Sequence, residues 1–406
     1  MRILLAAIYP YAFLLLYFII PFDDHGRIFP NILLALLVVA FPFIVKKNDF
    51  KKLKSWSVAI LFLLCAYLLI NSTLAGRIDS DFKIISKVLL SFGLVILYIP
   101  IADVRKLNSA IIFSSLVAII YSVYNFVLIT HETGSFALGE SPQVVESLLV
   151  DRLYLGLLST FSILISFLAI KKKFHPNNNY YLANIIINLV FIILIASKIS
   201  IIVLTVLFLI RQFYGKKKVW KMVAASLALA ALVGFFGVMK YEKQAFNKLK
   251  PGEGAPNFIE NSITWEIRTV VWQCAEEIIR NEGFTLTGAG FYETKDKLVS
   301  CYDTQIIDKA TEQKFISQRY NTHSQFIDFY LSAGFIAFFL FVLFIILNFI
   351  QVHNYFLPTA MLAILVMYCS VENVFQRQIG AYYMGFILIV LATSITAGTN
   401  NEIKKS

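Results

Sequence analysis

The sequence predicts an all-α protein that crosses a membrane many times. Of its 406 residues, 58% are hydrophobic and 15% are charged, and the mean hydropathy is +0.73, which is too apolar for a water-soluble chain of this length. Apolar runs of about 17 to 25 residues recur, and each can cross a hydrocarbon core of roughly 30 Å. We count twelve runs, at 3–20, 29–45, 56–73, 84–101, 109–129, 153–170, 181–197, 199–213, 222–239, 325–350, 358–371 and 380–397. The shortness of 199–213 and 358–371 leaves ten or eleven spans as alternatives.

Lysine and arginine are concentrated in alternate connections between these runs. They occupy the second, fourth, sixth and eighth connections, as Lys46, Lys47, Lys51, Lys52, Lys54, then Arg105, Lys106, then Lys171, Lys172, Lys173, then Arg211, Lys216, Lys217, Lys218, Lys221. Because cytoplasmic loops carry the excess of these residues, we expect these connections and both termini in the cytoplasm. The net charge of +11 is then mainly a topology signal, and its distribution does not favour nucleic-acid binding. The first run has no small-residue cleavage site, which predicts a retained anchor.

The same count divides the chain into three parts. Residues 1–239 are expected to form nine spans, residues 240–324 one large periplasmic loop, and residues 325–406 three further spans with a cytoplasmic tail. The loop begins with a charged stretch rich in glycine and proline, at 240–256, which is typical of a linker.

The rest of the loop contains an amphipathic segment and a histidine. From Ser262 to Arg280 apolar residues recur at spacings of three to four, which predicts a helix lying on the membrane with Trp265 and Trp272 at the headgroup level. Arg268 and Trp272 share one face of that helix. A turn at 288–290 follows, and residues 292–320 show little periodicity. His323 then lies at the mouth of the tenth span, where a lone histidine is more often structural than catalytic.

The four cysteines fall into two groups. Cys65 and Cys369 lie inside apolar runs, where a small buried hydrophobic side chain is the expected role. Cys274 and Cys301 share the large loop, and in an oxidising periplasm they either form a disulfide or stay apart, because their spacing alone does not bring them together.

Three basic residues lie at the outer ends of other spans. Lys87 is about one turn inside the fourth span, where it either snorkels to the interface or meets an anion. Arg152 opens the sixth span beside Asp151, and an ion-paired interfacial anchor is the simpler interpretation. Lys198 lies in the short stretch 196–200 between the seventh and eighth spans, where serine side chains can cap the helices and free N–H groups favour anions.

Taken together, these residues resemble the O-antigen ligase superfamily, which also includes O-antigen polymerases. The resemblance rests on the order Arg268-x-x-x-Trp272, then Gly288-x-Gly290, then His323 with Gly334 eleven residues further on. It covers about residues 84–380.

Further positions match this family and two depart from it. Lys87 matches a basic position at the start of an early span, and the segments Glu372-Asn373 and Arg377-Gln378-x-Gly380 match a part common to a subset of members. The last block of the family reads His-Asn, whereas this chain has His323-Ser324. The hairpin arginine of the family is replaced by Lys198, which keeps the charge but loses bidentate recognition of phosphate.

The resemblance implies a GT-C-like membrane glycosyltransferase of the bacterial inner membrane, with its active site facing the periplasm. Such enzymes transfer a glycan from undecaprenyl diphosphate to an acceptor hydroxyl, on lipid A-core or on another glycan, with no metal and no cofactor. A diphosphate leaving group needs fixed positive charge, and the attacking hydroxyl needs a proton acceptor such as histidine. Displacement at the anomeric carbon would invert its configuration.

The site residues that follow from the resemblance fall into three groups. His323, as base or as orienter of the acceptor, and Arg268 are expected to be catalytic. The expected donor contacts are Lys198, Lys87, Arg152 and Tyr154, the tyrosine toward a sugar ring. The supporting residues are Trp272, Gly288, Gly290, Arg377 and Glu372.

The residues leave the reaction open between two enzymes and one transporter. A ligase and a polymerase both need an arginine and a base outside the membrane. A transporter usually has two related halves and charges near the bilayer midplane. This chain instead has charges at the outer rim and a single lopsided loop, so we expect an enzyme, and most of all a ligase.

Overall fold

A computed structural model describes residues 2–23, 26, 28–101, 104–133, 148–171, 173, 175–214, 266–306 and 309–403, and these residues form helices, turns and no strand. Helices occur at every predicted span except 222–239, which lies outside the described residues, as do Ser262 and Trp265. Six helical segments are long and apolar enough to cross a membrane, at Ile3–Phe22, Trp56–Leu74, Lys106–Glu132, Arg152–Ala169, Asn177–Leu194 and Gln325–Val352. The chain is therefore an all-helical polytopic membrane protein.

The described helices form two compact units. Unit 1 comprises Met1–Ser55, Leu90–Leu207 and Arg377–Ser406, and unit 2 comprises Trp56–Leu89 and Phe208–Gln376. Each unit is therefore discontinuous in the sequence and contains segments from both halves of the chain.

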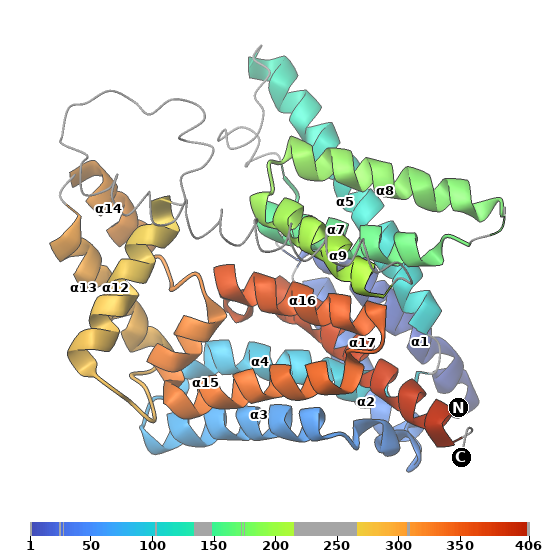
Figure 1. Ribbon diagram of the computed structural model, residues 1–406, viewed down its shortest axis with the longest axis horizontal. Coiled ribbons are helices and arrows are strands. Elements are labelled where there is room, and N and C mark those ends of the chain that lie inside the picture. Colours follow the sequence, from blue (N-terminus) through green and yellow to red (C-terminus); the bar gives the residue numbers. More distant parts are fainter. Residues whose placement is uncertain are drawn as a thin grey trace. The chain divides into compact units, whose positions relative to one another are not determined.

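Unit 1 is built around the helix α7. In this unit α1 (Arg2–Ile19) packs on α2 (Ile28–Ile44) and on α5 (Val104–Thr133). Helix α7 (Arg152–Ala169) also packs on α5, and it contacts α17 (Gln378–Ile403). It packs on α8 (Asn177–Leu194) as well, as Figure 1 shows. Asp151 begins α7, because its carboxylate accepts a hydrogen bond from the N–H of Leu153 at 2.9 Å. Residues from Leu153 to Ser166 are all buried.

Buried amides join α7 to α8 inside an otherwise apolar unit. The Asn184 amide donates to the hydroxyls of Ser162 at 2.9 Å and Ser166 at 2.8 Å, and the Ser115 hydroxyl of α5 donates to Ser162 at 2.8 Å. Polar side chains that bond between helices hold membrane bundles together where the hydrophobic effect cannot.

Unit 2 joins a membrane bundle to a group of polar helices. Helices α3 (Trp56–Leu74) and α15 (Gln325–Val352) run side by side, with α16 (Phe356–Val371) against α15 (Figure 1). The start of α4 (Ile78–Tyr98) belongs to the same unit. The polar helices α12 (Glu266–Glu282), α13 (Phe291–Gln305) and α14 (Lys309–Gln318) pack on one another, and we call them the α12–α14 cluster.

The α12–α14 cluster has a small core of its own and a disulfide. Val271, Leu298 and Tyr302 are fully buried there, and Cys274 is bonded to Cys301, which settles the open question of their pairing. Two expectations change. Residues 292–320 lacked periodicity but form α13 and α14, because short helices held by a shared core need only a few apolar contacts. The apolar face of α12 is covered by these helices, and Trp272 is partly buried against the same core.

Candidate active site

The candidate catalytic histidine lies just before α15 and is held by a carboxylate. Ser324 is the N-cap of α15, and His323 precedes it with a left-handed φ of 44°. The His323 Nδ1 lies 3.2 Å from an oxygen of Glu372, which follows α16. The Nε2 atom is buried and has no hydrogen-bond partner in the described part of the chain. One ring nitrogen is thus fixed by the carboxylate while the other stays available to a ligand.

Arg268 reaches the same carboxylate from α12. Its terminal nitrogen lies 3.8 Å from the Glu372 oxygen that faces His323, and its Nε donates to the carbonyl of Val371 at 3.0 Å. The structure therefore brings together the two residues expected to be catalytic, with Glu372 between them. We call these three residues the His323 site.

Electrostatics keep Glu372 ionised. Burial raises the pKa of this carboxyl, but the hydrogen bond and charge of His323 and the charge of Arg268 more than offset burial, so its pKa lies below the ordinary value. When His323 is neutral, an ionised Glu372 favours the one remaining ring proton on Nδ1, which leaves the lone pair on Nε2.

The segment from Val371 to Gln376 ties the His323 site to the surrounding helices. Trp272 donates through its indole N–H to the carbonyl of Thr322 at 3.0 Å. The Thr322 hydroxyl bonds to Asn373 at 3.0 Å, and this asparagine is fully buried with its Nδ2 lacking a partner among the described residues. Lys87 of α4 donates to the carbonyl of Gln376, so its ammonium is held at this segment and does not simply snorkel.

Two of the three glycines of the sequence motif, Gly288 and Gly334, are required because their backbones approach each other closely. Gly334 breaks α15 with φ 83°, and Gly288 has φ 67°. A Cβ on Gly288 would lie 2.5 Å from the backbone nitrogen of Gly334, and a Cβ on Gly334 would lie 2.1 Å from the carbonyl oxygen of Leu286. Only glycine fits at both positions, since the φ values and the contact distances each exclude a side chain.

Where α15 is interrupted at Gly334, backbone hydrogen bonds to the turn at 285–290 take the place of the missing helical ones. The N–H groups of Ala289 and Gly290 donate to the carbonyls of Leu331 and Ser332 at 2.9 and 2.8 Å, and the N–H of Phe335 donates to Thr285 at 2.9 Å. The turn thereby holds the first segment of α15, which begins directly after His323.

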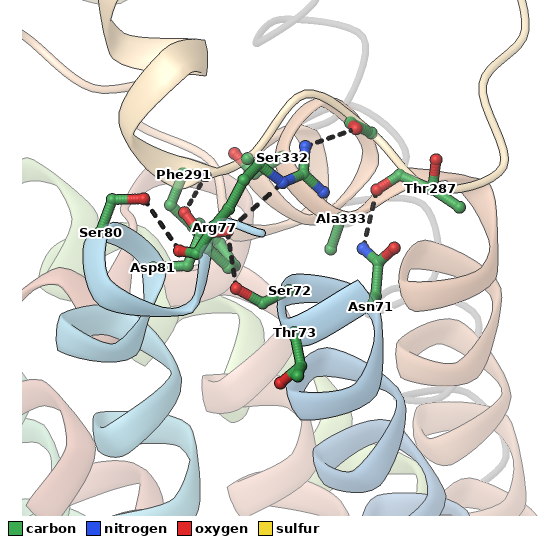
Figure 2. Close-up of polar contacts among 12 residues, drawn as sticks. Asn71, Ser72, Thr73, Arg77, Ser80, Asp81, Thr287, Phe291, Ser332 and Ala333 are labelled. Carbon is green, nitrogen blue, oxygen red and sulfur yellow. Dashed lines mark hydrogen bonds and ion pairs between the residues drawn. The ribbon is translucent and has the colours of Figure 1, made fainter. Parts of the chain in front are cut away.

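Asn71 of α3, Arg77 directly before α4 and Asp81 of α4 hold that turn (Figure 2). Asn71 donates to the carbonyl of Thr287 at 2.8 Å, and Arg77 donates to the carbonyl of Gly288 at 2.9 Å. Asp81, which is buried, accepts from the N–H of Phe291 at 2.8 Å and lies 3.9 Å from Arg77. We call Asn71, Arg77 and Asp81 the turn clasp. Its carboxylate caps the N-terminus of α13, where negative charge is favoured.

Removal of the negative charge of Asp81 should lower the stability of the protein. In Asp81→Asn we expect a loss of about 1–3 kcal/mol, because a buried charged hydrogen bond and the partner of Arg77 are weakened together. Thermal unfolding of the purified protein in detergent measures the loss. Asp79→Asn is the control, because Asp79 is exposed in the first turn of the same helix. Equal midpoints for the two variants would contradict the role of Asp81.

The remaining predicted residues belong to unit 1. Lys198 is the first residue of α9 (Lys198–Phe213), after a turn in which Ala196 has φ 47° and the hydroxyls of Ser197 and Ser200 lie 2.7 Å apart. A Cβ on Gly156 of α7 would lie 2.2 Å from the Ser200 hydroxyl, so α7 touches this turn directly. The tight turn lined with serines is confirmed.

Arg152, Tyr154 and Arg377 lie around the start of α7. Arg377 lies 3.6 Å from the Asp151 carboxylate and 6.0 Å from the centre of the Tyr154 ring. Tyr154 is buried against Tyr383, so little of its ring is open to a sugar. Arg152 lies one turn before Gly156 on α7, on the face that meets the Lys198 turn.

Sequence reasoning missed the turn clasp and the role of Asn373. Arg77 and Asp81 are four residues apart in a polar helix start, which is the only local signal, and their partners lie about 210 residues away in the chain. Among the described residues, no three His, Cys, Asp or Glu side chains gather as a metal site requires.

A known family matches the middle part of the chain. Residues 183–342 match the family model described as O-antigen ligase. This match supports the O-antigen ligase superfamily. The matched region contains Lys198, Arg268, the glycines of the 288–290 turn, His323 and Gly334, whereas Glu372 and Lys87 lie outside it. No curated protein matches the chain. Together with the membrane-spanning helices, the match supports an O-antigen ligase-like or polymerase-like membrane enzyme of the bacterial inner membrane, with a lipid-linked glycan and an acceptor as its general partners.

Proposed function

We propose that this enzyme is an O-antigen ligase that moves a glycan from undecaprenyl diphosphate to a hydroxyl of lipid A-core. The observation that carries the proposal is the His323 site, in which the ionised carboxylate of Glu372 orients His323 beside Arg268, and this histidine and arginine both lie in the segment that matches the family. The expected steps follow from that arrangement. The Nε2 of His323 accepts the proton of the acceptor hydroxyl as its oxygen bonds to the anomeric carbon and the bond to the diphosphate breaks.

Positive charge stabilises the departing diphosphate in this mechanism. Arg268 and Lys87 supply it from unit 2, since both contact the segment 371–376. Lys198 and Arg152 remain proposed donor contacts, supported by their places at the N-termini of α9 and α7, where helix dipoles also favour anions. The buried Nδ2 of Asn373 is a suitable hydrogen-bond donor to a sugar or phosphate oxygen near His323.

The proposed topology places this chemistry in the periplasm. The disulfide between α12 and α13 supports an oxidising compartment for the segment 240–324, because disulfides are rare in the cytoplasm. Twelve spans with both termini cytoplasmic, nine before this loop and three after it, are the arrangement that we propose. Inversion at the anomeric carbon and independence from metal are parts of the same proposal.

A polymerase is the alternative, and Ser324 is the reason to keep it. The family block reads His-Asn, so the acceptor beside His323 can differ from that of a typical ligase. Purified protein should be given an undecaprenyl-diphosphate-linked glycan with either lipid A-core or a second lipid-linked repeat. Glycosylated lipid A-core supports the ligase, lengthened lipid-linked glycan supports the polymerase, and no product with either acceptor overturns the proposal.

Gene deletion distinguishes the same two reactions in the cell. A ligase deletion should accumulate long glycans on undecaprenyl diphosphate, whereas a polymerase deletion should leave surface glycan of a single repeat. Unchanged surface polysaccharide would contradict both.

A further inference from the structure

The loop at 283–286, between α12 and α13, exposes two large apolar side chains. It leaves α12 and leads into the turn that is bonded to α15, and its Phe284 and Leu286 are 66% and 54% exposed. The helices on either side of it bury apolar residues in the core of the α12–α14 cluster. The loop is therefore an apolar surface beside polar helices, and we call it the apolar loop.

The apolar loop continues an exposed aromatic surface of α15. The ring of Phe284 lies 5.2 Å from the ring of Phe335, and that ring lies 6.1 Å from the ring of Phe339, one turn further along α15. Phe339 is itself 50% exposed. Because α15 is long and apolar enough to cross the membrane, its exposed apolar side chains face lipid. The three rings therefore extend the lipid-facing surface of α15 onto the apolar loop.

The length of α15 places the apolar loop at the edge of the hydrocarbon core. The part of α15 before Gly334 carries the polar side chains of Gln325 and Asp328, which are buried in protein. The part after Gly334 runs to Val352 and rises about 27 Å, which is close to the roughly 30 Å of a hydrocarbon core. The core therefore begins near Gly334, where the turn that follows the apolar loop is bonded to α15.

Helix α3 gives the same level independently. Its 19 residues rise about 28 Å, so its two ends lie near the two edges of the hydrocarbon core. Asn71, in its last turn, donates to the carbonyl of Thr287 at 2.8 Å, and the neighbouring Ile70 is exposed. The turn that follows the apolar loop is thus level with the end of α3, at the boundary between hydrocarbon and headgroups.

The polar groups beside the apolar loop have partners within the protein. Glu282, the last residue of α12, lies 2.6 Å from the ammonium of Lys297 on α13. The carbonyl of Leu286 accepts a hydrogen bond from the hydroxyl of Tyr67 at 3.0 Å. An apolar medium penalises charges and carbonyls that have no partner, so these contacts lower the cost of placing the loop in lipid.

We propose that the apolar loop inserts Phe284 and Leu286 among the acyl chains of the leaflet next to the α12–α14 cluster. The partner is the bilayer itself, because the depth of the loop and its continuity with α15 both point to acyl chains. The insertion fixes the height of the cluster, and with it Arg268 of α12, relative to the membrane. It does not require that glycan transfer occurs.

Spin labels test the insertion in the full-length protein. Phe284→Cys is labelled with a nitroxide and placed in nanodiscs of phosphatidylethanolamine and phosphatidylglycerol. Power saturation then compares collisions with oxygen, which concentrates in lipid, and with a water-soluble nickel chelate. We expect an oxygen-to-nickel ratio several-fold higher than for Ser300→Cys, the matched control, because Ser300 is exposed on α13 of the same cluster. The unsubstituted protein sets the background, since its free cysteines, Cys65 and Cys369, are buried.

Other occupants of the apolar loop give different results. These nanodiscs contain no polyprenyl lipid, so a high oxygen ratio comes from acyl chains and not from the tail of a glycan donor. A second copy of the chain would shield the label at position 284 from both reagents and broaden its spectrum. Shielding from both reagents, or a ratio equal to that of Ser300→Cys, would overturn the proposal.

A second label separates insertion from a structural role. With the nitroxide on Leu286→Cys, the further change Phe284→Asp should lower the oxygen ratio several-fold, because a carboxylate is excluded from hydrocarbon. Phe284→Trp should keep the ratio, as should Tyr292→Asp, which removes an exposed aromatic ring outside the apolar loop. The insertion is refuted as well if Phe284→Asp leaves the ratio at position 286 unchanged. Loss of transfer with these ratios intact would contradict the proposed function alone.

Discussion

Replacement of His323 by alanine is expected to lower the rate of glycan transfer by about 10²–10⁴-fold, the usual contribution of a positioned general base. The physical reason lies in the two ring nitrogens. Nδ1 is fixed on Glu372 at 3.2 Å, and Nε2 is buried with no partner among the described residues. No other described side chain at the His323 site offers a neutral nitrogen lone pair. Transfer should be measured with purified enzyme and a lipid-linked donor.

The matched control is His353→Ala. His353 caps the opposite end of α15, is exposed, and bonds to the carbonyl of Ile350 at 2.8 Å, so its loss removes a histidine without touching the His323 site. Both variants should reach the membrane in equal amount. Transfer by the His323 variant within a few-fold of the His353 variant would rule out a base at this position.

Span positions could be predicted from the sequence because they depend on local composition. A run of apolar residues must form a helix in lipid, since every backbone group has to be bonded within its own segment. The helices therefore coincide with the expected runs wherever the structure describes them. The turn before Lys198 was predictable for the same reason, because so short a connection requires small hydroxyl residues to cap the helices.

The polar helices and the contacts of the site were not predictable in this way. α13 and α14 are fixed by a shared core and a disulfide, which leave only a weak apolar pattern in the sequence. Glu372 lies 49 positions from His323 in the chain, so their contact is a property of the fold. The family motif indicated His323 and Arg268 individually, whereas only the structure shows that the Glu372 carboxylate lies between them.

The structure explains why the sequence motif contains glycine at Gly288 and Gly334. Gly288 and Gly334 belong to separate blocks of the motif, yet their backbones touch, and the bonds between them replace the bonds that the break in α15 leaves open. These two glycines therefore allow the contact between the turn and α15. That contact positions the start of α15, and with it His323. The largest stability effect is expected here.

Gly288→Ala should destabilise the protein by about 2–5 kcal/mol. A left-handed φ costs a side chain about 1–2 kcal/mol, and overpacking adds about 1–3 kcal/mol. The new Cβ would lie 2.5 and 2.6 Å from the backbone nitrogens of Gly334 and Ala333, which cannot move aside as a flexible side chain can. A lower thermal midpoint in detergent and a loss of transfer should appear together, because the turn that holds α15 is displaced.

Gly283→Ala separates the two parts of this cost. Gly283 ends α12 with φ 70°, close to the 67° of Gly288, but a Cβ there would meet nothing within 4 Å. Its substitution should therefore cost only the backbone term, about 1–2 kcal/mol, and leave transfer intact. The difference between the two midpoints then measures the close approach of Gly288 to Gly334 alone. If both variants unfold at the same temperature, the junction tolerates a side chain and does not position His323.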